Sequence, residues 1–128
     1  MPSYFRRPYG PGWALVGDAG YLKDPCTAKG ITDAFRHAEL LADALDDGLR
    51  GTRPFGEALA DYERRRNAAA MPMYDFTYAT SALEPPTPQE EELFEAMRDD
   101  PALAGRFFGV FAGTVPVHDF FASLSPAA

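Results

Sequence analysis

The sequence predicts a mostly α-helical chain: one short strand near the N-terminus, followed by four or five helices. Two observations predict this class. Beyond residue 30, apolar residues recur at spacings of three and four, and proline and glycine clusters cut that region into helix-sized segments. The run at residues 13–16 (WALV) is the single convincing strand signal, because it is short, continuously apolar and stopped by Gly17-Asp18.

The N-terminal region predicts a strand without a partner. Residues 1–12 contain three prolines and two glycines, which is typical of an extended arm or loop. A lone strand cannot satisfy its own backbone hydrogen-bonding groups, and no second strand is evident downstream. We therefore expect the rest of a sheet to lie outside this chain.

The first helix is expected from residue 31 to about residue 49, ending near Gly48 and Gly51. Its apolar stripe is rich in alanine, which allows another backbone or a sheet to approach closely. The stripe consists of Ile31, Ala34, Phe35, Ala38, Leu41, Ala42, Leu45 and Leu49.

A second helix is expected from Pro54 to Ala70. Pro72 should then kink or end it, although the aromatic stretch at residues 74–78 can continue it.

Two further helices carry strong start signals. Thr87-Pro88-Gln89-Glu90 forms a capping box ahead of a helix at residues 88–98. Asp100-Pro101 repeats the signal for a helix at residues 101–112, and a short turn is expected at residues 117–123.

Composition narrows the function classes. The 128 residues include 12 basic and 19 acidic residues, and the resulting net charge of -7 disfavours binding to nucleic acid. A single cysteine permits no internal disulfide, which suits a cytoplasmic location. No apolar run is long enough to span a membrane, and His118 has no second ligand at metal-binding spacing, so no metal site is expected.

Residues 13–34 concentrate polar groups where ligands bind in α/β proteins. Asp18 follows the predicted strand, and Gly30 stands at the start of the first helix. Ligands of open α/β sheets bind at the carboxyl ends of strands, and helix N-termini offer free N–H groups. Asp18 can therefore accept hydrogen bonds from ligand hydroxyls, while the amides near Gly30 and Ile31 can meet a negatively charged oxygen.

This pattern resembles the second flavin fingerprint of the FAD-dependent aromatic hydroxylases, typified by para-hydroxybenzoate hydroxylase. Gly17-Asp18-Ala19 matches the opening of the fingerprint, Pro25 its loop proline, and residues 28–32 (AKGIT) its helix start. The spacing of Leu59, Tyr62 and Arg66 also looks like the family. The resemblance implies a fragment of an α/β, Rossmann-like FAD-binding fold. Related halogenases and geranylgeranyl-reductase-like proteins share this architecture, so the reaction type stays open.

The resemblance also implies roles for individual residues. The Asp18 carboxylate would contact the ribityl chain of FAD, and the amides of Gly30 and Ile31 would face the flavin pyrimidine oxygen. The Pro25 carbonyl would face the substrate. The expected cofactor-binding residues are Gly17, Asp18, Pro25, Lys29, Gly30, Ile31 and Thr32.

Enzymes of this kind hold the FAD pyrophosphate with a G-x-G-x-x-G unit, which this chain lacks. We therefore expect residues 1–51 to complete an FAD-binding domain whose N-terminal half is a missing partner, with residues 52–128 as a helical extension. The chain alone should bind FAD weakly. The resemblance implies a monooxygenase-like oxidoreductase acting on a small organic substrate, with NADH or NADPH as electron donor and no catalytic side chain of its own. The alternative is a non-enzymatic, acidic helical module that binds a protein partner.

Several other residues have simpler interpretations. His37 is expected at the surface, on the polar side of its helix, and Cys26 is expected to be inert. Lys29 is interpreted either as a solvated side chain or as a flavin contact. Residues 64–66 (RRR) are expected to form a solvated or ion-paired face.

Overall fold

The computed structural model describes residues 3–124, so the ends of the expected arm and of the expected extension (1–2 and 125–128) lie outside the described residues. The chain forms two compact units, Met1–Tyr78 and Ala79–Ala128. The boundary falls within the second long helix, whereas the expected functional segments divide at residue 51. The prediction of a mostly helical chain is confirmed.

The prediction of a single strand is wrong, because the first unit contains four short strands in two antiparallel sheets. β1 (Tyr4–Phe5) pairs with β4 (Tyr21–Leu22), and β2 (Tyr9–Gly10) pairs with β3 (Trp13–Ala14). Each ladder is two residues long, which is too short to show an alternating pattern in the sequence. The expected arm and loop therefore hold three of these strands.

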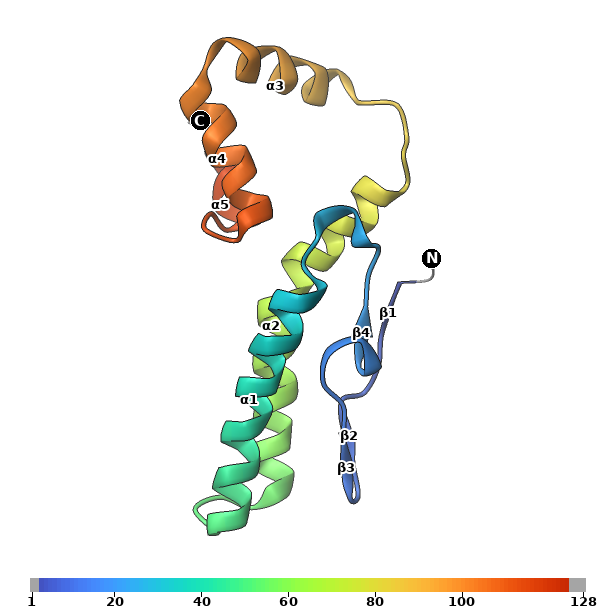
Figure 1. Cartoon of the computed structure of the whole chain (residues 1–128), viewed down its shortest axis with the longest axis vertical. Coiled ribbons are helices and arrows are strands. Elements are labelled where there is room, and N and C mark those ends of the chain that lie inside the picture. Colours follow the sequence, from blue (N-terminus) through green and yellow to red (C-terminus); the bar gives the residue numbers. More distant parts are fainter. Residues whose placement is uncertain (1–2, 125–128) are drawn as a thin grey trace. The chain divides into compact units, whose positions relative to one another are not determined.

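The long helices α1 (Gly30–Arg50) and α2 (Phe55–Ser81) form a helical hairpin (Figure 1). The first expected helix is confirmed. The hairpin core lies where small residues let the helices approach and a tyrosine fills the space between them. It consists of Ala44, Ala58 and Tyr62, with Leu40, Leu41 and Leu59 packed around them.

The buried face of α1 differs from the expected one. Ile31, Phe35 and Leu49 of the predicted apolar stripe are 76%, 75% and 77% exposed. Asp33 and His37 are buried instead, so the prediction of a surface histidine is wrong. The polar face is covered because the loop before α1 folds back onto the helix within this unit.

α2 continues beyond the expected end at Ala70 and passes through Pro72 to Ser81. A proline inside a helix removes one backbone hydrogen bond, so other contacts must hold the segment beyond it. The Tyr74 ring packs against the Phe5 ring at 4.7 Å, and the Thr77 hydroxyl bonds to the Thr27 hydroxyl at 2.8 Å. These tertiary contacts were not evident from the sequence.

The second unit contains α3 (Pro88–Asp99), α4 (Pro101–Ala112) and α5 (Val117–Ala122). The capping box at Thr87 is present, and the Asp100 carboxylate accepts hydrogen bonds from the first amides of α4. The fully buried side chains of Val110 and Phe120 form the centre of this unit. Between residues 3 and 124, no helix is long and apolar enough to cross a bilayer.

Candidate functional site

The expected Gly-Asp turn lies directly on the first helix. It forms a 3-10 turn, η1 (Gly17–Ala19), in which Gly17 has a φ of 58°. A Cβ at Gly17 would approach the Ala34 Cβ to 3.2 Å. Only glycine suits both the left-handed backbone and this close approach.

Asp18 and Gly30 lie next to each other, as the flavin interpretation requires. An Asp18 carboxylate oxygen is 4.0 Å from the place where a Cβ of Gly30 would stand, and apart from the adjacent residues and the backbone of its own helix turn no other atom lies within that distance. The Tyr4 hydroxyl donates to the Asp18 carbonyl at 2.9 Å and holds the turn in place. The Asp18 side chain is exposed and is free of ion pairs with other described residues.

The N-terminus of α1 leaves its first amides available. The first intrahelical hydrogen bond runs from the Asp33 amide to the Lys29 carbonyl at 2.9 Å, and no side chain caps this end. The amides of Gly30, Ile31 and Thr32 therefore project from a helix end that carries partial positive charge. This arrangement suits a negatively charged or carbonyl oxygen beside the Asp18 carboxylate.

The loop proline forms a second turn, η2 (Pro25–Thr27). The Pro25 carbonyl accepts a hydrogen bond from the Ala28 amide at 2.8 Å, so it is engaged within the loop. Desolvation of the Cys26 thiol and its neighbour Asp24 raise the pKa of Cys26 above its ordinary value. A raised pKa leaves less thiolate, which fits the interpretation of Cys26 as an inert residue.

A buried ionic cluster, made of Tyr21, Lys23 and Asp33, joins β4 to the first turn of α1. The Lys23 ammonium bonds to both the Asp33 carboxylate and the Tyr21 hydroxyl, and that hydroxyl donates to Asp33 at 2.9 Å. Burial and the Asp33 carboxylate raise the pKa of Tyr21 far above its ordinary value. This cluster was not evident from the sequence, although in an extended segment the i, i+2 spacing of Tyr21 and Lys23 places both side chains on one face.

Two polar residues that were interpreted as solvated, Lys29 and His37, are buried. Lys29 is 7% exposed, so its interpretation as a solvated side chain is wrong. His37 is 1% exposed, its ring centre is 5.4 Å from that of Tyr21, and its Nδ1 atom has no hydrogen-bond partner among the described residues. Burial lowers the pKa of His37 to about 4.

The arginine cluster divides into an exposed part and a buried part. Arg64 and Arg65 pair with Asp61 and Asp43, as expected of an ion-paired face. Arg66 is 2% exposed, so the same expectation is wrong for this residue.

Arg66 and Tyr62 of α2 instead bind backbone carbonyls of the N-terminal segment. Arg66 donates to the Arg6 carbonyl at 3.0 Å and the Gly20 carbonyl at 3.5 Å. The Tyr62 hydroxyl donates to the Leu15 carbonyl at 2.7 Å. Together they clamp both ends of the segment that carries η1.

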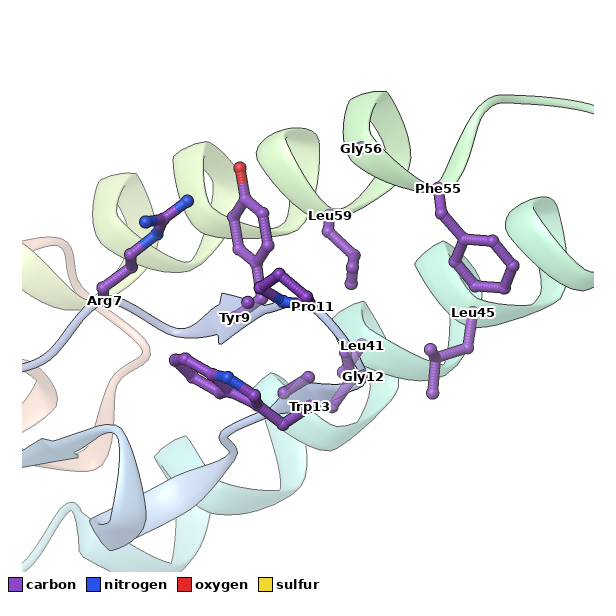
Figure 2. Close-up of a pocket in the computed structure, with 12 residues that line it drawn as sticks. Arg7, Tyr9, Pro11, Gly12, Trp13, Leu41, Leu45, Phe55, Gly56 and Leu59 are labelled. Carbon is purple, nitrogen blue, oxygen red and sulfur yellow. The ribbon is translucent and has the colours of Figure 1, made fainter.

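A separate apolar pocket of about 730 Å³ lies between the β2–β3 hairpin and the two long helices (Figure 2). None of the expected cofactor-binding residues lines it. Its larger apolar side chains are Tyr9, Trp13, Leu41, Leu45, Phe55 and Leu59.

Within residues 3–124, no group of three or more histidine, cysteine, aspartate or glutamate side chains is placed to hold a metal ion. Comparison of the chain with protein-family models, curated protein sequences and solved structures finds no match.

Proposed function

We propose that this chain is the C-terminal, flavin-contacting segment of an FAD-dependent, monooxygenase-like oxidoreductase. In this proposal a nucleotide-binding half with the G-x-G-x-x-G unit is the partner of the chain. The proposal rests chiefly on the adjacency of the Asp18 carboxylate and the uncapped start of α1 at Gly30. A flavin needs both an acceptor for its ribityl hydroxyls and donors for its pyrimidine oxygen, and these two features supply them.

The residues at this site fit the cofactor. Gly30 has room for a Cβ, which beyond its own helix turn would meet only the Asp18 carboxylate, at 4.0 Å. Packing within the described chain therefore does not require glycine at this position, whereas close approach of a ligand to the helix amides does. Asp18 would hold the ribityl chain, and the amides of Gly30 and Ile31 would orient the pyrimidine ring. When bound, FAD would supply the redox chemistry.

In this proposal the residues of the chain hold the cofactor and polarise it, and they do not transfer protons. The helix N-terminus stabilises negative charge on an oxygen bound to its amides. Lys29, buried at the same helix end, adds a positive charge. The exposed stripe at Ile31, Phe35 and Leu49 offers the missing half an apolar surface to cover.

The test is titration of the full chain with FAD, followed by amide NMR. We expect weak binding, in the millimolar range (about 4 kcal/mol), with shifts concentrated at Asp18, Gly30, Ile31 and Thr32. AMP, which lacks the flavin, should leave these amides unchanged. Asp18→Ala should abolish the FAD shifts. Shifts that are absent, or that persist in Asp18→Ala, would refute the proposal, and flavin that co-purifies stoichiometrically would refute the need for a second half.

A second variant separates ligand binding from folding. Gly30→Ala should raise the free energy of unfolding by about 0.5 kcal/mol, because alanine favours the helix, yet weaken FAD binding by blocking the helix amides. Gly105→Ala is the matched control, since a Cβ there also meets open space within a helix. It should stabilise the chain and leave FAD binding unchanged.

The alternative, a protein-binding helical module, is favoured by apolar side chains on the second unit. Leu83 and Phe108 are 88% and 66% exposed. Capture of a protein partner that is unaffected by Asp18→Ala and lost in Phe108→Ser would favour this function over the flavin proposal.

A further inference from the structure

The apolar pocket lies away from the proposed flavin site. Leu41 and Leu45 line it and follow Gly30 by 11 and 15 residues along α1. At a rise of 1.5 Å per residue, they lie about 16 and 22 Å from the start of the helix. A ligand in the pocket would therefore not compete with one at the helix N-terminus.

Two walls of the pocket are built by aromatic rings that pack on glycines. A Cβ at Gly10 would come within 2.5 Å of the Trp13 ring, and a Cβ at Gly48 would come within 2.5 Å of the Phe55 ring. Each ring thus lies against a backbone that has no side chain there. These contacts hold the walls in place before any ligand arrives.

The polar side chains that line the pocket are all hydrogen-bond donors or can act as donors. Figure 2 shows Arg7, Tyr9 and Trp13 on the hairpin side, opposite leucines from both helices. Arg7 is the single charged residue among those that line the pocket, in a chain with a net charge of -7. Its guanidinium lies 5.4 Å from the centre of the Tyr9 ring, and among described residues it has no acidic partner.

We propose that this pocket binds an aliphatic carboxylate, with the chain of the ligand among the leucines and its carboxylate at Arg7. The volume of about 730 Å³ falls within the usual range for small-molecule sites. A guanidinium binds a carboxylate through two parallel hydrogen bonds, and the Tyr9 hydroxyl and Trp13 indole N–H add further donors. Arg7 is exposed, so its guanidinium is open to an anion that enters from solvent.

Trp13 provides a direct readout, because it is the only tryptophan and is 47% exposed in the free pocket. The experiment titrates the full chain with octanoate and, separately, with 1-octanol, following the emission wavelength of Trp13. Octanol is the more hydrophobic of the two, so a purely apolar site prefers it. We expect octanoate to bind about tenfold more tightly, with a blue shift as Trp13 becomes buried.

Two pairs of variants locate the effect. Arg7→Gln should reverse the preference in favour of octanol, and Arg36→Gln, on an exposed residue outside the pocket, should not. Gly56 lines the pocket and faces open space, so Gly56→Leu should fill the pocket and abolish both shifts. The matched helical control is Gly105→Leu, which should leave them intact.

Three results would overturn the proposal. The first is a Trp13 emission that neither ligand shifts, and the second is tighter binding of octanol to the unaltered chain. The third is a blue shift that rises with protein concentration in the absence of ligand, because a second copy of the chain would then occupy the pocket.

Discussion

The Asp33 carboxylate connects two parts of the candidate site. It binds Tyr21 of β4 and Lys23 directly after that strand, and it lies in the first turn of α1, three residues after Gly30. The side chains of Lys23 and Asp33 are 4% and 8% exposed, so each charge depends on the other. A buried ion pair contributes little net stability, but removal of one partner leaves an uncompensated charge.

Asp33→Asn should therefore lower the free energy of unfolding by about 3 kcal/mol, because the Lys23 ammonium stays buried without its counter-ion. Urea denaturation measures this difference. Asp46→Asn is the control, since the Asp46 pair with Arg50 is exposed and such pairs contribute less than about 1 kcal/mol. Equal losses in the two variants would contradict the role given to Asp33.

His37 should make stability depend on pH. Burial lowers its pKa to about 4; the nearby Asp33 opposes this shift, and the positive charges of Arg66, Lys23 and Arg36 add to it. The unfolded chain, with an ordinary histidine pKa near 6.5, binds more protons than the folded chain between these values. Stability is therefore lost as the pH falls from about 6.5 to 4. Between pH 7 and pH 5 we expect a loss of about 2 kcal/mol from this residue.

Denaturant titrations of the unaltered chain and of His37→Gln at the two pH values isolate this contribution. The variant should lose the acid-induced decrease that His37 causes. The equivalent change at the exposed His118 should leave the decrease intact. A pH dependence that is unchanged in His37→Gln would contradict the assignment.

At the scale of elements, cap residues made the helices of the second unit predictable. A Thr87 or Asp100 side chain bonds to amides within three residues, so sequence spacing alone shows whether the cap can form. The same locality placed the Gly17-Asp18 turn and the Gly30 helix start. However, the local sequence around each motif does not show that Asp18 and Gly30 lie next to each other. Only the family resemblance implied that they do.

The strands and the buried face of α1 were not predictable because they depend on distant contacts. β1 and β4 pair across 16 or more residues through ladders of two residues each, which carry no periodic signal. His37 is buried because Tyr21, in β4, packs over a helix face that is polar in sequence. Tertiary contacts overrode the local pattern at these positions.

The hydrogen bonds that join α2 to the N-terminal segment should depend on the planar shape of the Arg66 guanidinium. Arg66→Lys keeps the positive charge, but a lysine side chain has no planar guanidinium group that can donate to the carbonyls of both Arg6 and Gly20. The Gly20 carbonyl keeps its hydrogen bond from the Arg6 amide at 2.8 Å, whereas the Arg6 carbonyl loses its guanidinium donor. This loss should lower the free energy of unfolding by about 2 kcal/mol. Arg64→Lys, on an exposed side chain of the same helix, should change it by less than about 0.5 kcal/mol. Thermal or urea denaturation that fails to distinguish the two variants would contradict the clamp.

At the scale of the whole molecule, the exposed stripe of α1 is the feature that the rest of the fold leaves unexplained. Its apolar residues recur at the spacing that is typical of a buried helix face, yet Ile31, Phe35 and Leu49 are at least 75% exposed. Apolar faces of this kind in monomeric proteins often mark a surface that another molecule covers. The flavin proposal assigns this face to the missing half, which connects the stripe to the helix end where Gly30 lies.

The stripe should therefore cause the isolated chain to self-associate. The double variant Phe35→Glu with Leu49→Lys keeps the net charge of -7 and places two charges on the exposed face. Because these side chains contact solvent, the free energy of unfolding should change by less than about 0.5 kcal/mol per site. Sedimentation velocity should show an association that rises with concentration for the unaltered chain and a monomer for the variant. The charge-swapped control Arg36→Glu with Glu39→Lys alters exposed residues off the stripe, so association should persist. An unaltered chain that stays monomeric at high concentration would contradict the inference that this face is built to be covered.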